Sequence, residues 1–495
     1  MFGLDYRSLG LLRIGLGILI LCQLYVSVWD LRGLYSDEGM MPRSLLLANY
    51  GPVLSLYMGG GSMGFLAVMF AVQALLALML IVGHRTRIAT IASYVMLLSL
   101  QARNPILVFG PDITMRVCFF WAMFLPLNRR FSLDAALGRA VPPKTNTYLG
   151  MPGVAYIVQF ALVYIFSGVL KAGPTWTKDF SAVARTLTLE VWSRPLGAWL
   201  NQFDSLTTWI TILTPPLEVY GPLLLILPLW SGTGRVLALL LFTGLQLGFN
   251  LTMQMGMFGP VMITVSVALL PAGFWTYLAE PLARWFARIF GPLKPLTARF
   301  RDQIGRRRIA EARVRWKPYS WPRLLSLSKV GRDGVLALLV IYIVFWNLGG
   351  VPGSTHSVPA EYAWIGPSLG IDQFFDFFTP DPHTDDGWFV IVGNLKNGRR
   401  VNAFTGESTV SFEKPASVYS TYVDQRWSAF LICFWGDTCN QYMEPFSKYL
   451  ALEWNRHHTG PEQMKSIEIS YMRSFVTAAH TRTPVTQELL WTENF

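Results

Sequence analysis

Long apolar stretches recur through the first 350 residues of the chain, separated by short polar segments. A membrane hydrocarbon core of about 30 Å requires about 20 apolar residues per helix. The pattern therefore predicts about nine membrane-spanning helices, at residues 9–28, 62–83, 86–102, 113–127, 151–171, 206–229, 233–252, 257–279 and 333–351. The fourth stretch is short, so an arrangement of eight spans stays open.

The pattern changes after the ninth stretch. Short segments with the alternation typical of strands are followed by longer ones with helical periodicity, and Asn397-Gly398 favours a hairpin turn between the first two strands. The expected strands are 388–393, 399–405 and 466–472, and the expected helices are 418–435 and 441–455. Residues 352–495 are therefore predicted to form a small α+β domain.

Composition agrees with a membrane protein. Hydrophobic residues make up 52% of the 495 residues and charged residues only 14%, where soluble domains carry about 25% charge. This excludes a disordered regulator, an ordinary cytosolic enzyme and a cysteine-stapled secreted toxin. The fold class predicted is an α-helical multi-pass membrane bundle followed by a small extracytoplasmic α+β domain.

The net charge of +11 is concentrated in one segment. Residues 281–332 contain 14 Lys and Arg and two acidic residues, whereas the rest of the chain has a net charge of −1. A basic loop between two spans is typical of the cytoplasmic side, so we expect this segment to contact anionic lipid rather than nucleic acid. Counting spans from it places the N-terminus in the cytoplasm and the C-terminal domain outside, with the 85–87 turn, the 128–150 loop and Arg235 on the cytoplasmic side.

These patterns divide the chain into four parts. Residues 1–280 form a membrane domain, 281–332 a basic cytoplasmic linker, 333–351 the last transmembrane helix and 352–495 the extracytoplasmic domain. Cys433 and Cys439 in that last domain either form a disulfide or stay free, depending on the compartment. No histidine lies within a span and no metal-ligand motif is present, so no metal site is predicted.

Ionisable residues in or beside the spans are the candidate site residues, because a charge buried there is costly unless something compensates it. Arg13 and Arg116 are expected to be paired structurally. Lys171 at the outer end of the fifth span is either a snorkelling lysine or a candidate base in a partly desolvated site. Glu218 follows Pro215-Pro216, which free backbone carbonyls, and either lines a polar cavity or is a paired structural glutamate.

The predicted topology brings the outer ends of several spans to the same level. One outward-facing cavity is therefore expected, with Lys171 as candidate base and with polar contacts and apolar walls from neighbouring span ends. The residues expected around it are Arg103, Asn104, Asp112, Lys171, Trp176, Glu218, Gln246, Asn250 and Phe258.

At these residues the chain resembles the HTTM membrane domain family, which is related to the vitamin K-dependent γ-glutamyl carboxylases. The resemblance rests on short motifs in the same order along nearly the whole chain. They are Arg103-Asn104, Trp121–Pro126 with Ser132–Asp134, Tyr164–Lys171 with Trp176, Gly256–Phe258, Leu270-Pro271, Asp376–Pro382, Gly387-Trp388 and Arg426-Trp427.

The resemblance implies a helical bundle with its active face on the outer side and a lysine, here Lys171, that activates a reduced vitamin K or other quinol. It also implies a bacterial inner-membrane location and a role in maturing or exporting a secreted peptide or protein. Two histidines of the carboxylases are replaced here by Pro105 and Gln246. Neither replacement can act as an acid or base near neutral pH.

Three functions are therefore weighed. The leading one is an HTTM-family protein that is not a true carboxylase and holds a quinone-like, lipid or peptide ligand in the cavity. The second is a vitamin K-dependent glutamate γ-carboxylase, a lyase, with altered helper residues. The third is a non-catalytic, membrane-anchored scaffold whose outer domain binds a partner.

Overall fold

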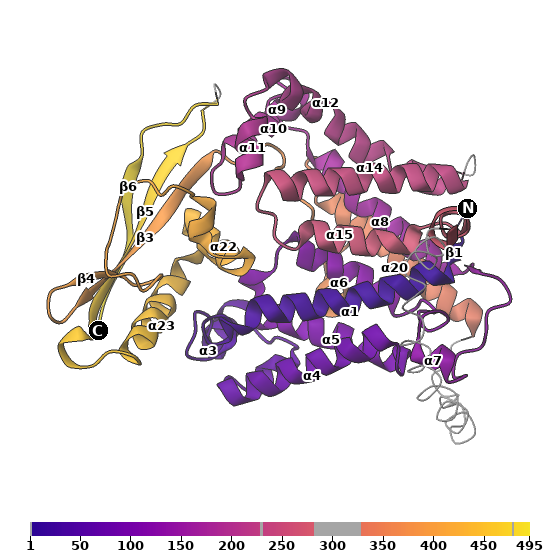
Figure 1. Cartoon of the computed structure of the whole chain (residues 1–495), viewed down its shortest axis with the longest axis horizontal. Coiled ribbons are helices and arrows are strands. Elements are labelled where there is room, and N and C mark those ends of the chain that lie inside the picture. The colour runs from indigo at the N-terminus through magenta and orange to yellow at the C-terminus, as the bar shows by residue number, and fades with distance from the viewer. Residues whose placement is uncertain (1, 228–230, 282–327, 478–479) are drawn as a thin grey trace, which may run out of the picture.

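The structure is a computed structural model that describes residues 2–227, 231–281, 328–477 and 480–495. A bundle of helices makes up most of the molecule, and a sheet domain caps one end of it (Figure 1). The main bundle helices are α1 (Tyr6–Val28), α4 (Met63–Val82), α5 (Thr86–Arg103), α6 (Gly110–Ala122), α8 (Met151–Leu170), α12 (Asp204–Tyr220), α14 (Ser231–Thr252), α15 (Phe258–Ser266) and α20 (Lys329–Gly349).

Short helices connect or extend these. They are α2 (Leu31–Tyr35), α3 (Arg43–Tyr50), α7 (Leu133–Ala136), α9 (Pro174–Thr177), α10 (Ala182–Thr188), α11 (Pro195–Leu200), α13 (Leu223–Ile226), α16 (Ala272–Phe274) and α21 (Ile365–Leu369). Most of the predicted basic linker, residues 282–327, lies outside the described residues.

Local side-chain chemistry sets several helix ends. The Asp5 carboxylate accepts a hydrogen bond from the Arg7 backbone N–H at the start of α1, and the Ser62 hydroxyl caps α4 in the same way. Gly83 ends α4 with a φ of 73°, a conformation that favours glycine. A Cβ at Gly83 would lie 2.5 Å from the Ser132 side chain, so a larger residue would also push away the loop that packs there.

Six helices in the described part of the chain are long and apolar enough to cross a membrane. They correspond to the predicted spans at 9–28, 62–83, 151–171, 206–229, 233–252 and 333–351, and they identify the chain as a membrane protein. A seventh candidate, predicted at 257–279, is a broken pair of helices bent by 94°. The break falls at Leu270-Pro271, where proline cannot donate the backbone hydrogen bond that would continue the helix.

The third and fourth predicted spans, at 86–102 and 113–127, are α5 and α6 within the bundle. Helix α5 has arginines near both ends and several polar residues between them, so it is less apolar than the six candidate membrane-spanning helices. Helix α6 has 13 residues and is about 20 Å long, which is shorter than a hydrocarbon core. A count of nine spans therefore stays a prediction.

One end of the bundle gathers the segments that were expected to share the cytoplasmic side. The Arg7 guanidinium pairs with Glu280 at 2.6 Å, and Arg235 donates to the Gly3 carbonyl at 2.7 Å. The Arg85 backbone N–H donates to the Asp134 carboxylate at 2.9 Å. The sheet domain lies at the opposite end from the N-terminus (Figure 1).

The sheet domain contains four antiparallel strands in the order β4-β3-β5-β6. Their bounds are β3 (Asp385–Leu395), β4 (Arg400–Asn402), β5 (Met464–Phe475) and β6 (Thr486–Asn494). The predicted hairpin and third strand are confirmed, whereas β6 was not predicted. A separate two-stranded sheet pairs β1 (Leu4–Asp5) with β2 (Thr147–Tyr148) near the N-terminus.

Two helices, α22 (Gln425–Ile432) and α23 (Met443–Asn455), lie on the side of the sheet that faces the bundle (Figure 1). The helix predicted at 418–435 is broken, because Val423 has a φ of 60° and Asp424 caps a new helix from its side chain. Cys433 and Cys439, left open by the sequence, form a disulfide with a Cα–Cα distance of 5.7 Å.

A buried ion pair joins the sheet domain to the bundle. The Arg426 guanidinium of α22 contacts both carboxylate oxygens of Asp112 in α6 at 2.8 Å, and it also donates to the Leu107 carbonyl at 2.6 Å. Burial alone would lower the pKa of Arg426, but the Asp112 carboxylate offsets this, and the pKa lies above its ordinary value. Gln23 of α1 donates to the same carboxylate, so three elements meet at Asp112.

Glycines allow two further close approaches at this interface. A Cβ at Gly110 would lie only 1.6 Å from the Phe377 ring. Gly256, with a φ of 53°, leaves room for the Gln425 side chain, whose amide oxygen accepts a hydrogen bond from the Met257 backbone N–H at 2.8 Å. The sheet domain is therefore packed onto the bundle by matched shapes as well as by charge.

Replacing Arg426 by alanine is expected to loosen the sheet domain, because it leaves the Asp112 carboxylate buried without its partner. The expected loss is about 3–5 kcal/mol of unfolding free energy, with faster proteolysis between the two domains. Denaturant unfolding in mixed micelles and limited proteolysis measure both. Arg400→Ala, which breaks an exposed ion pair with Glu468, is the control and should change little. Equal behaviour of the two variants would contradict this role of Arg426.

Candidate functional site

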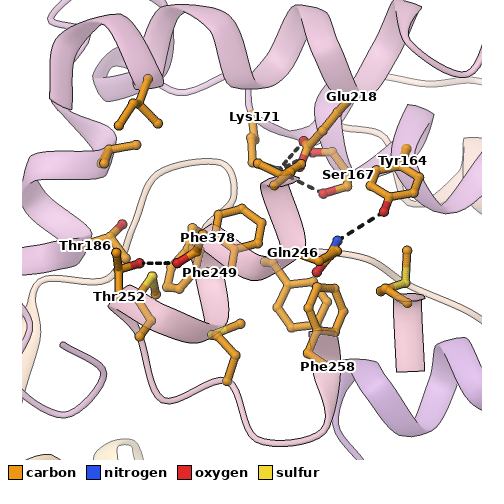
Figure 2. Close-up of a pocket in the computed structure, with 18 of the residues that line it drawn as sticks. Tyr164, Ser167, Lys171, Thr186, Glu218, Gln246, Phe249, Thr252, Phe258 and Phe378 are labelled. Carbon is orange, nitrogen blue, oxygen red and sulfur yellow. Dashed lines mark hydrogen bonds and ion pairs between the residues drawn. The ribbon is translucent and has the colours of Figure 1, made fainter. Parts of the chain in front are cut away.

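A cavity of about 280 Å³ lies at the end of the bundle that carries the sheet domain. Helices α8, α12, α14 and α15 and the segment before β3 contribute its walls. Figure 2 shows Lys171, Glu218 and Ser167 close together in this cavity, with Gln246 and Tyr164 beside them. Phe249, Phe258, Phe378, Thr186 and Thr252 are among the other side chains that line it. We call it the Lys171 cavity.

The close packing of α8 and α12 creates the polar part of this cavity. A Cβ at Gly168 of α8 would lie 2.7 Å from Val219 and 3.0 Å from the Cβ of Glu218, so a glycine is needed for α12 to approach this closely. Pro215 and Pro216 stand one turn before Glu218 inside α12. The approach brings the Lys171 ammonium within 2.6 Å of the Glu218 carboxylate.

The Lys171 ammonium has three hydrogen-bond acceptors within the protein. It donates to the Ser167 hydroxyl at 2.8 Å and to the Ser167 carbonyl at 3.1 Å, in addition to Glu218. It also lies 5.5 Å from the centre of the Trp176 ring, within the range of a cation–π contact. Lys171 and Glu218 are only 5% and 3% exposed. The lysine is thus held inside the protein and does not snorkel.

Gln246 of α14 gives the cavity a second polar group. Its amide nitrogen donates to the Tyr164 hydroxyl at 3.1 Å, and the Tyr164 ring stacks on Phe242. The amide oxygen of Gln246 is buried and has no hydrogen-bond partner in the described structure. A buried acceptor without a donor is costly, so this oxygen offers a contact to a ligand with an O–H or N–H group.

The wall opposite these groups comes from the segment that leads into the sheet domain. Phe375, Phe377 and Phe378 line the cavity, and Phe377 packs on Phe258 with ring centres 4.9 Å apart. The Trp176 indole donates to the Phe378 carbonyl at 2.9 Å. The sequence assigned residues 375–378 to the outer domain and did not predict them in the cavity, because about 200 residues separate them from Lys171.

Five of the predicted site residues line this cavity together: Lys171, Trp176, Glu218, Gln246 and Phe258. The others lie elsewhere. Arg103 donates to the Met41 carbonyl and Asn104 to the Leu34 carbonyl, so both hold the 29–62 loop in place. Asp112 binds Arg426, and the Asn250 amide donates to the Gln246 backbone carbonyl. The expectation that these four surround the same cavity is not met.

Arg103 and Asn104 lie away from the cavity because the end of α5 packs against the 29–62 loop. A prediction made one span at a time does not include that loop.

Arg13 and Arg116 are both buried, as expected of structural arginines. Arg13 donates to the Ile81 carbonyl at 2.7 Å, and Arg116 pairs with Asp372 at 3.0 Å. In the described ranges, no cluster of His, Cys, Asp and Glu side chains could hold a metal ion.

The fold and the site together define a class: a multi-helix membrane protein with a docked α+β domain and an aromatic cavity, built around a buried Lys–Glu pair, where the two meet. Comparisons with known proteins add no closer assignment. No family model, no curated protein and no solved structure matches the chain.

The Lys171–Glu218 pair can be tested by a double-mutant cycle. Lys171→Met leaves the Glu218 carboxylate buried and unpaired, and it is expected to cost about 3–5 kcal/mol of unfolding free energy. Glu218→Gln leaves the ammonium unpaired and should cost a similar amount. The double variant Lys171→Met/Glu218→Gln should lose clearly less than the sum, because no charge remains. Additive losses in denaturant unfolding would mean that the two side chains do not interact.

Proposed function

We propose that this protein is an HTTM-family membrane protein that binds a quinone-like ligand, preferentially in its reduced form, in the Lys171 cavity. The observation that carries the proposal is the combination of a buried Lys–Glu pair and an unpartnered Gln246 oxygen in a cavity whose other walls are mainly apolar. Ligand sites are commonly apolar cavities with a few polar groups that fix orientation, and about 280 Å³ is near the small end of their range.

The chemistry of the two polar groups favours a quinol. The Lys171 ammonium can share a hydrogen bond with a ligand oxygen, and the Gln246 oxygen accepts one from a hydroxyl. A hydroquinone supplies both an acceptor and a donor, whereas the oxidised quinone has only acceptors and leaves the Gln246 oxygen unpaired. Phe258, Phe377 and Phe378 offer faces on which a flat ring can pack.

A route from the membrane supports a lipid-soluble ligand. Helix α12 packs chiefly on α8, and α14 packs chiefly on α15. Ile210 of α12 and Gly244 and Gly248 of α14 line the cavity, and both glycines are exposed on the bundle surface. A ligand dissolved in the bilayer could therefore enter between α12 and α14.

We further propose nine spans in a bacterial inner membrane, with the N-terminus in the cytoplasm and the sheet domain outside. The disulfide between Cys433 and Cys439 supports an oxidising compartment for the sheet domain. The arginines at the opposite end of the bundle, among them Arg85 and Arg235, support the cytoplasm for that end.

The resemblance to carboxylases makes glutamate carboxylation a second candidate function. The residues of the cavity favour ligand binding without carboxylation. Gln246 stands in the wall where the carboxylases have a histidine, and its amide cannot exchange a proton near neutral pH. Pro105, at the other replaced histidine, does not line the cavity. Quinol-dependent transfer of labelled bicarbonate to glutamate peptides would decide for a carboxylase.

The proposed preference for a quinol can be measured with a short-chain 1,4-naphthoquinol and its quinone on the full chain in nanodiscs. The quinol is expected to bind about tenfold more tightly, because it satisfies the Gln246 oxygen. Gln246→Leu should abolish the preference by weakening quinol binding. Gln202→Leu, at an exposed glutamine, is the matched control. If both redox forms bind equally, or if neither binds, the proposal fails.

The orientation can be tested with a reporter enzyme that is active only outside the cytoplasm. Fused after Phe495, the reporter should be active, and inserted between Lys144 and Thr145 in the loop at the opposite end it should be inactive. The reverse pattern would contradict the proposed orientation, because it would place the Lys171 cavity on the cytoplasmic side.

A further inference from the structure

A second cavity, of about 510 Å³, lies beside the bundle at the same end and shares no lining residue with the Lys171 cavity. It is formed by α5, α6, the end of α20 and the segment after α21. Polar side chains from three of these elements reach it: Gln101, Arg116, Asp372 and Gln373. Leu98, Trp346 and Phe374 supply apolar walls. We call it the Arg116 cavity.

A chain of hydrogen bonds fixes which atom of Gln373 is left without a partner. The Trp121 indole, which can only donate, binds the amide oxygen of Gln159 at 3.1 Å. The Gln159 amide nitrogen therefore faces Gln373, and it donates to the amide oxygen of Gln373 at 2.6 Å. This leaves the Gln373 amide nitrogen, a donor, with no partner in the described structure.

Gln101 and Arg116 each have an atom without a partner as well. Gln101 donates its amide nitrogen to the Asp112 backbone carbonyl at 3.1 Å, which leaves its amide oxygen without a partner. Arg116 uses one terminal nitrogen for the Asp372 carbonyl and carboxylate, and its Nε has no partner. Gln373, Gln101 and Arg116 are only 2%, 5% and 8% exposed, so bulk water does not satisfy these atoms.

Each of the three unmade hydrogen bonds costs free energy unless a partner supplies it. A single water occupies about 30 Å³, far less than this cavity, and the apolar walls give a larger body of water few partners. Arg116 is already paired with the Asp372 carboxylate, so the lining has no net charge. The free donors of Arg116 and Gln373 suit the oxygens of a phosphate, and the free acceptor of Gln101 suits a hydroxyl. Leu98 and Trp346 suit an aliphatic stem.

We propose that the Arg116 cavity binds a phosphate ester with a neighbouring hydroxyl, carried on an apolar stem, as in the headgroup of a phosphatidylglycerol. Arg116 and Gln373 hold phosphate oxygens, and the Gln101 oxygen accepts from the glycerol hydroxyl. The exposed Tyr50 stands at the edge of the cavity, where the stem leaves it. This site does not depend on the function proposed for the Lys171 cavity.

The test uses the full chain in detergent micelles and calorimetric titration with dihexanoyl phosphatidylglycerol. Gln373→Glu keeps the acceptor for Gln159 but places a carboxylate oxygen where the amide donor stood, and it is expected to weaken binding at least tenfold. Ala102→Phe fills the cavity without touching its polar groups and should weaken binding equally. Gln202→Glu adds the same charge at an exposed position and should leave binding unchanged.

Three further probes separate the sources of the phosphate. Glycerol 3-phosphate lacks the acyl chains, inorganic phosphate lacks the glycerol as well, and dihexanoylglycerol lacks the phosphate. Much weaker binding of all three supports a lipid headgroup, whereas equal binding of glycerol 3-phosphate supports a soluble phosphate ester in the same site. The proposal is overturned if dihexanoylglycerol binds as tightly as the phospholipid, if no probe binds, or if correctly folded Ala102→Phe binds like the unchanged protein.

Discussion

The ion pair between Lys171 and Glu218 is the interaction on which the rest of the site depends. Two charges buried inside a membrane bundle cost several kcal/mol each unless they meet in good geometry. Gly168 permits that geometry by bringing α12 against α8, and Ser167 supplies the remaining hydrogen bonds. The result is a fixed ammonium at the edge of the Lys171 cavity, shielded from bulk water.

The sheet domain is part of this cavity rather than an independent appendage. Phe375, Phe377 and Phe378 reach the cavity only because the domain is docked, and the buried Arg426–Asp112 pair and the Gly110 contact hold it there. The same docking places Gln373 against Gln159 and so completes the Arg116 cavity. A partner that bound the sheet domain and shifted it would therefore change both cavities together.

Local patterns predicted much of this architecture. The lengths of the apolar stretches located six of the membrane-spanning helices. The positions of Lys171, Gln246 and Phe258 near helix ends grouped them with Trp176 and Glu218 around one cavity. Long-range packing decided the rest. Arg103 and Asn104 were misplaced because they donate to carbonyls of the 29–62 loop, and Asp112 because its partner, Arg426, lies 314 residues away. The sequence around these residues does not indicate that the 29–62 loop or Arg426 is the partner.

The central claim is that the Lys171 cavity is a ligand site. Photo-crosslinking tests it most directly: a naphthoquinol carrying a diazirine is activated on the full chain in nanodiscs, and the labelled peptides are identified by mass spectrometry. The account predicts labels on the cavity residues of α8 and α14 and on residues 375–378, with loss of label when unmodified quinol is added in excess. Labels spread over the lipid-facing surface of α4, without competition, would contradict it.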